Sequence, residues 1–130
     1  MKKVAIISIA MITAMLFSSF TIPVRWEHLG SRKINHTLDR DVIYVTGAEG
    51  SFNALKIKVG HKPIALYDIK VHYRNGGVED IKTRIHVPAG GESRVIDLRG
   101  RNRVIEKVVF RYETKGSHDK RAKILLFGRH

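Results

Sequence analysis

The sequence of 130 residues contains no cysteine. This absence excludes disulfides, thiolate zinc sites, cysteine nucleophiles and an N-terminal cysteine that carries a lipid. After residue 23 the sequence also lacks the 3.6-residue apolar stripe of an amphipathic helix. We therefore expect an all-β fold that is held together by its apolar core alone.

Acidic residues are scarce. The chain has 12 Asp and Glu against 24 Lys and Arg, a formal charge of +12. Such an excess attracts polyanions, so we expect an anionic envelope polymer, an anionic lipid or an acidic protein as the partner. The hydrophobic content of 43% is ordinary for a globular protein, and the length predicts one domain.

The N-terminus has the three-part layout of a secretory signal peptide. Lys2 and Lys3 precede an apolar run at residues 4–17, and small polar residues follow before Pro23. We predict a removable signal peptide over residues 1–21, one domain over residues 22–130, and a periplasmic or secreted location. Removing the two lysines with the signal leaves 22 basic and 12 acidic side chains, or +10.

An uncleaved anchor is the alternative for the same segment. No charged residue lies between Lys3 and Arg25, and a bilayer span needs roughly 20 residues. A contact with the membrane is expected only in that case. Both interpretations export the domain from the cytoplasm.

The rest of the chain alternates with a period of two. Short β-branched and aromatic runs are separated by turn residues, which is typical of a sandwich or a barrel. We predict a single antiparallel β-sandwich of about eight strands, the last of them central because both of its faces are largely apolar. The expected strands are residues 25–31, 41–46, 52–59, 64–73, 78–87, 92–98, 104–113 and 121–127.

One hairpin can be predicted in register. A three-residue loop at residues 74–76, with Gly76 in the left-handed conformation, joins the strands 64–73 and 78–87. Lys70 then faces Asp80, and Asp68 faces Lys82, so opposite charges meet across the strands.

Alternation also assigns side chains to faces. In the strand 64–73, one apolar face is expected to carry Ala65, Tyr67, Ile69, Val71 and Tyr73. In the strand 104–113, one apolar face is expected to carry Val104, Val108, Phe110 and Tyr112.

No catalytic or metal site is evident. The seven histidines form no i,i+2 pair, and no helix is expected to carry an i,i+4 pair, so we predict no metal and no cofactor. Ser117, His118 and Asp119 are triad residue types, but consecutive residues in a turn rarely converge. No carboxylate lies in a clearly apolar context, so we do not expect an enzyme.

Basic clusters are the strongest functional signal, because arginine-rich loops bind phosphate or carboxylate groups bidentately. We predict a ligand-binding role for two of them: Arg99, Arg101 and Arg103 in one loop, and Lys115, Lys120, Arg121 and Lys123 in and after another. Further cations are expected to line a solvated sheet face: Lys56, Lys58, Lys70, Lys82 and Arg84. The only tryptophan, Trp26, is either packed or available to stack on a sugar ring or a base.

Two other functions remain open. A hydrolase of envelope polymers would need two unpaired carboxylates across a groove. A small nucleic-acid-binding barrel of the OB type would use aromatic stacking platforms, for which the candidates are Tyr44, Phe52, Tyr67 and Tyr73. The export signal argues against nucleic acid as the partner.

Three stretches together carry a resemblance to a known family: residues 26–30 (WEHLG), residues 94–100 (RVIDLRG) and residues 127–130 (FGRH). They resemble small secreted bacterial β-proteins known as domain of unknown function 2541. The resemblance covers roughly residues 25–130 and implies a β-sandwich and an exported location. It brings no active site with it, and this chain departs from some relatives in lacking cysteine.

Overall fold

The computed structural model describes residues 24–34, 38–46, 49–114 and 122–130. The expected signal peptide at residues 1–21 lies outside these residues. The strands are β1 (Trp26–Lys33), β2 (Leu38–Tyr44), β3 (Ser51–Phe52), β4 (Ala54–Gly60), β5 (Ile64–Tyr73), β6 (Val78–Ile81), β7 (Ile85–Val87), β8 (Ile96–Asp97), β9 (Arg103–Thr114) and β10 (Lys123–Arg129). No helix of the described part is long and apolar enough to cross a membrane.

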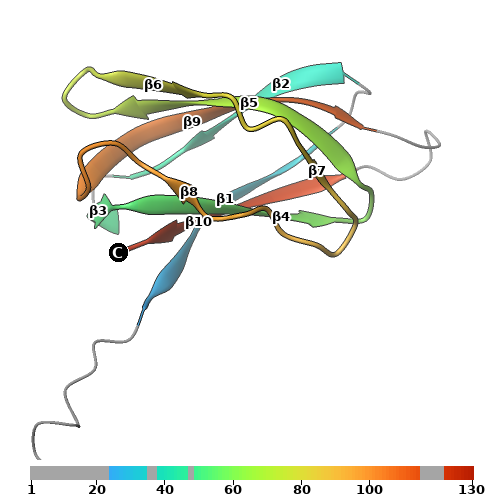
Figure 1. The fold of residues 1–130 in the computed structure, drawn as a ribbon, viewed down its shortest axis with the longest axis horizontal. Coiled ribbons are helices and arrows are strands. Elements are labelled where there is room, and N and C mark those ends of the chain that lie inside the picture. Colours follow the sequence, from blue (N-terminus) through green and yellow to red (C-terminus); the bar gives the residue numbers. More distant parts are fainter. Residues whose placement is uncertain (1–23, 35–37, 47–48, 115–121) are drawn as a thin grey trace, which may run out of the picture.

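The strands form two antiparallel sheets that lie face to face (Figure 1). One sheet has four strands in the order β1-β10-β4-β8. The other has six, in the order β2-β9-β5-β6, with β3 paired to β9 and β7 paired to β5. Apolar side chains from both sheets fill the space between them, among them Phe52, Phe110 and Tyr112, all fully buried. The predicted all-β, antiparallel sandwich is confirmed.

Ten strands replace the eight that were expected, because two predicted strands are interrupted. The run 52–59 breaks at Asn53, where the chain leaves β9 of one sheet and joins β10 of the other. The run 78–87 breaks at residues 82–84. The run 92–98 pairs only at Glu92 and over Ile96–Asp97.

The predicted hairpin register is confirmed for β5 and β6. Ile69 lies opposite Ile81 and Lys70 lies opposite Asp80. Gly76 has a φ of 94°, and its N–H donates to the carbonyl of Tyr73. The three-residue loop therefore sets the register, as the opposite charges indicated.

The expected pair of Asp68 and Lys82 is wrong. Asp68 pairs instead with Arg111 of β9 at 2.6 Å, and Lys82 pairs with Asp80 of its own strand region. The reason is that the ladder between β5 and β6 ends at Ile69 and Ile81, so Lys82 lies beyond it and Asp68 pairs with β9 instead. Beside Asp68, the register of β5 against β9 shifts between Leu66 and Asp68, which marks a bulge at Tyr67. A bulge places an extra residue in one strand and moves the side chains beyond it to the other face.

The same effect corrects both predicted faces. Before the bulge in β5, the core is contacted by Ile64 and Leu66, not by Ala65 and Tyr67. In β9 the register shifts a second time, because His72 lies opposite Lys107 and Tyr73 lies opposite Ile105. Ile105 is therefore buried in the core, and Val104, which was expected there, is exposed.

Candidate anion-binding pocket

The predicted loop at residues 99–103 uses most of its charge locally. The Arg103 guanidinium stacks on the Tyr73 ring at 3.6 Å and donates to the Arg99 carbonyl at 2.8 Å. The Arg99 side chain lies 3.8 Å from the carboxylate of Glu79. Arg101 is exposed, with a φ of 51°. Of the three, Arg101 is the one whose side chain has no ion pair, hydrogen bond or ring contact with the described residues.

Of the second predicted cluster, only Lys123 lies among the described residues, where it is the first residue of β10. Lys115, Lys120 and Arg121 fall outside the described residues. The twelve residues of β9 lie between residues 99–103 and the end of the domain where β10 begins, and a strand of that length spans about 36 Å. Residues 99–103 and Lys123 therefore do not form one site.

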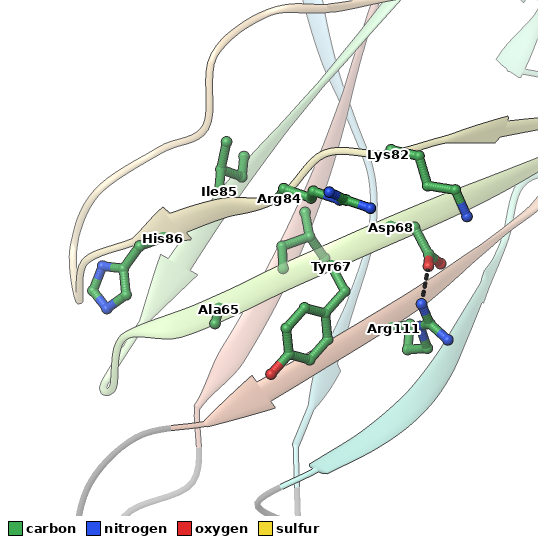
Figure 2. Close-up of a pocket in the computed structure, with 9 residues that line it drawn as sticks. Ala65, Tyr67, Asp68, Lys82, Arg84, Ile85, His86 and Arg111 are labelled. Carbon is green, nitrogen blue, oxygen red and sulfur yellow. Dashed lines mark ion pairs between the residues drawn. The ribbon is translucent and has the colours of Figure 1, made fainter.

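A pocket of about 530 Å³ lies on the outer face of the six-stranded sheet (Figure 2). This volume is within the range of small-molecule sites, about 300–1,000 Å³. Strands β5, β7 and β9 and the break between β6 and β7 supply its lining: Ala65, Leu66, Tyr67, Asp68, Lys82, Arg84, Ile85, His86 and Arg111.

Two irregularities of the sheet make the pocket. The bulge at Tyr67 in β5 faces the break between β6 and β7, where the Arg84 N–H donates to the Tyr67 carbonyl at 3.1 Å. Thr83, which is buried, fixes the break by donating its hydroxyl to the Leu66 carbonyl at 3.2 Å. The paired strands separate here, and their side chains surround a hollow instead of meeting across a ladder.

Arg84 holds a backbone conformation that side-chain-bearing residues rarely adopt. Its φ is 43°, in the left-handed region that glycine prefers. Its side chain is exposed, has no ion pair with the described residues, and extends over β5 toward Asp68 (Figure 2). Strain of this kind, held by Thr83 on one side and Ile85 on the other, is often found at binding sites.

Arg111 is held in place by a buried carboxylate. Asp68 is 6% exposed, and its Oδ2 lies 2.6 Å from Nη2 of Arg111 (Figure 2). The Arg111 side chain is otherwise 60% exposed. A guanidinium has five N–H donors, so the donors that Asp68 does not use remain for a ligand.

Positive charge dominates this face. A smaller hollow of about 160 Å³ adjoins the pocket and shares Asp68, Lys82 and Arg111 with it. The two hollows together are lined by five cations and two carboxylates: Arg40, Lys70, Lys82, Arg84 and Arg111 against Asp68 and Asp80. Such a surface attracts and orients an anion.

Tyr67 lines the pocket as a hydrogen-bond donor. Its hydroxyl donates to the Glu113 carboxylate, and this bond, helped by burial, raises the pKa of Tyr67 above its usual range. The phenol therefore stays protonated. Asp68, which lines the pocket, and Glu113, which accepts from Tyr67, each have a donor partner. Neither is an unpaired acid or base.

The sequence analysis did not predict that Arg84 and Arg111 line the same pocket. Lys70, Lys82 and Arg84 were expected to share one face with Lys56 and Lys58, but the latter two lie on the four-stranded sheet. Arg111 was not singled out at all. The alternation pattern offered no signal for either bulge, because both depend on which strands become neighbours.

Residues 6–128 match the family described as domain of unknown function 2541. The chain belongs to this family. The family has no assigned activity, so membership confirms the resemblance and leaves the role of the pocket open. No curated protein matches the sequence at a significant level.

Three solved structures are similar to most of this chain at low sequence identity. AlgX of Pseudomonas aeruginosa is 16% identical, with a TM-score of 0.49, covering 77% of this chain and 26% of AlgX. The STIV MCP is 9% identical, with a TM-score of 0.51, covering 84% of this chain and 48% of that one. A family 29 carbohydrate-binding module is 10% identical, with a TM-score of 0.36, covering 83% of this chain and 90% of the module. At these identities the likeness concerns the fold alone.

Proposed function

We propose that the protein is an exported, non-catalytic binding module that takes an anionic group of an envelope polymer into the pocket of the six-stranded sheet. The observation that carries this proposal is the pair of exposed guanidinium groups at the pocket, Arg84 in a strained backbone and Arg111 fixed by buried Asp68. Export is the prediction from the N-terminal sequence, and it selects an envelope polymer over a cytoplasmic ligand.

The chemistry of the lining supports a carboxylate, sulfate or phosphate group as the ligand. Arginine binds such groups through two parallel N–H donors, and Lys82 adds a point charge beside it. The apolar floor of Ala65 and Ile85 provides room for a carbon skeleton. A ligand with one acidic group on a small ring would contact both the cationic side chains and the apolar residues of the pocket.

The test compares two arginines with the same backbone conformation. Arg84→Gly and Arg101→Gly each remove one exposed positive charge and each place glycine at a positive φ. We expect the affinity for D-glucuronate, measured by amide NMR titration, to fall about tenfold or more for Arg84→Gly, because a charge-assisted hydrogen bond is lost. Neutral D-glucose should leave the pocket amides unshifted.

The choice of glycine guards against misfolding. Both variants relieve backbone strain, so thermal unfolding should show each to be as stable as the unaltered protein or more stable by about 0.5–1 kcal/mol. A loss of binding with stability retained belongs to the side chain. If Arg101→Gly lost glucuronate binding and Arg84→Gly kept it, the loop at residues 99–103 would replace the pocket as the site.

The two rival functions find less support. A hydrolase would need unpaired carboxylates, and Asp68, Asp80 and Glu113 each have a partner. For stacking on nucleic acid, Phe52 and Tyr73 are unsuitable because both are buried in the core.

A further inference from the structure

The outer face of the four-stranded sheet has an apolar centre. Central strand β10 points Ile124 and Leu126 into the core, yet its outward side chains include Leu125 and Phe127, which are only half-buried. No strand of the described part of the chain packs over them. A solvated sheet face normally carries polar residues, and an apolar patch rimmed by charge marks an interaction site.

Aromatic rings and cations alternate across this face. Trp26 lies opposite Arg129, and His28 lies opposite Phe127, with ring centroids 5.2 Å apart. Lys56 Nζ is 4.4 Å from the Trp26 ring, and Lys58 Nζ is 4.9 Å from the Phe127 ring. We define the aromatic platform as Trp26, His28, Lys56, Lys58, Leu125 and Phe127.

Like charges meet at the far end of the platform. Lys33 of β1 lies directly opposite Lys123 of β10 on the same outward face. Like charges in this position destabilise a strand pair. An anion bound between the two ammonium groups would remove that repulsion, which gives Lys123 the role that the sequence suggested for it.

The charge of the whole face is unbalanced. It carries five cations: Lys33, Lys56, Lys58, Lys123 and Arg129. Two of these have carboxylate partners, Lys56 with Glu92 at 3.6 Å and Arg129 with Asp97 at 3.4 Å. The partner that fits this face is therefore a polyanion.

We infer that the aromatic platform is a second binding site, distinct from the pocket, for an extended polysaccharide that carries acidic sugars. The apolar faces of sugar rings stack on Trp26 and Phe127. Lys56 lies next to Trp26 and Lys58 lies next to Phe127, and both pair with the acidic groups. Strand β10 is seven residues long and spans about 20 Å, so the chain contacts several consecutive sugars.

Trp26 reports directly on this site, because it is the only tryptophan of the chain. We expect polygalacturonate, a linear polymer of a sugar acid, to shift or quench the Trp26 fluorescence saturably, and neutral dextran to leave it unchanged. The measurement uses the unaltered protein. Saturable binding of polygalacturonate with no change in Trp26 emission would overturn the assignment.

Variants identify the residues that act. Phe127→Ala should weaken polygalacturonate binding about three- to tenfold through lost ring contact, and Lys58→Gln should weaken it and reduce its salt dependence. Tyr44→Ala removes an exposed aromatic ring of the other sheet and should have no effect. Arg84→Gly should also keep the Trp26 response, so failure of the pocket and failure of the platform are told apart.

Two other polyanions serve as competitors. Single-stranded DNA or vesicles of anionic lipid that displaced polygalacturonate from the platform at equal charge concentration would overturn the choice of a glycan. Failure of both to displace it supports that choice.

Discussion

His130 closes the domain by bonding through both ring nitrogens. Nδ1 lies 3.1 Å from the Ser51 carbonyl, which only accepts, so Nδ1–H donates. Nε2 lies 2.5 Å from the Glu27 carboxylate, and the ring packs against the Phe52 ring at a tilt of 40°, with centroids 4.5 Å apart. The last residue of the chain thus joins β1 to β3, and the Glu27 carboxylate makes this contact sensitive to pH.

Replacing Glu27 by glutamine should lower the melting temperature at pH 7. The hydrogen bond from His130 lowers the pKa of the Glu27 carboxyl below its ordinary value of 4.5. A carboxyl with a lowered pKa stabilises the fold above its ordinary pKa and loses this effect as pH falls through the folded value. The difference between Glu27→Gln and the unaltered protein should therefore shrink below about pH 4 in thermal melts.

Glu49 provides the control, because its shift has the opposite sign. The hydrogen bond with Glu27 and burial raise the pKa of Glu49, so its ionised form opposes folding at neutral pH. Glu49→Gln should raise the melting temperature at pH 7 or leave it unchanged. Equal losses for the two variants at pH 7 would contradict this account of the cluster.

At the level of the strand, β10 depends on a glycine. A Cβ at Gly128 would lie 2.6 Å from a Phe52 ring carbon and 2.9 Å from a Leu29 methyl. Gly128→Ala should lower the unfolding free energy by about 1–3 kcal/mol, since a packed core must move to admit the methyl group. Chemical denaturation measures the effect.

Gly60 of β4 is the matched control for this prediction. A Cβ there would meet only the Lys123 Cβ, at an ordinary 3.8 Å. Gly60→Ala should change the unfolding free energy by less than about 0.5 kcal/mol. A loss at Gly60 as large as that at Gly128 would mean that strand conformation, and not the contact with Phe52, sets the cost.

The alternation of apolar and polar residues predicted most of the strands, but it predicted none of the bulges within them. The β5–β6 register followed from a turn glycine and facing charges, which are neighbours in sequence. The bulge at Tyr67 arises where β5 pairs with β9, about forty residues away, and no local pattern encodes that partner. The pocket depends on this bulge, so Arg84 and Arg111 could not be brought together before the fold was known.

For the molecule as a whole, the two proposed sites lie on opposite outer faces of the sandwich. The pocket opens from the six-stranded sheet and the platform covers the four-stranded sheet. The two sheets lie face to face (Figure 1), and the apolar core fills the space between them. Packed sheets are about 10 Å apart, so a single short segment of polymer cannot reach both sites. One protein molecule would then hold two polymer chains.

Light scattering of mixtures tests this bivalency. With polygalacturonate at fixed concentration, scattering should rise as protein is added and fall again in protein excess, when each polymer chain is saturated separately. Arg84→Gly should abolish the scattering peak while the Trp26 signal still saturates, because one face remains active. A peak that survived in Arg84→Gly would show that cross-linking needs only the platform and the net charge of +10 outside residues 1–21.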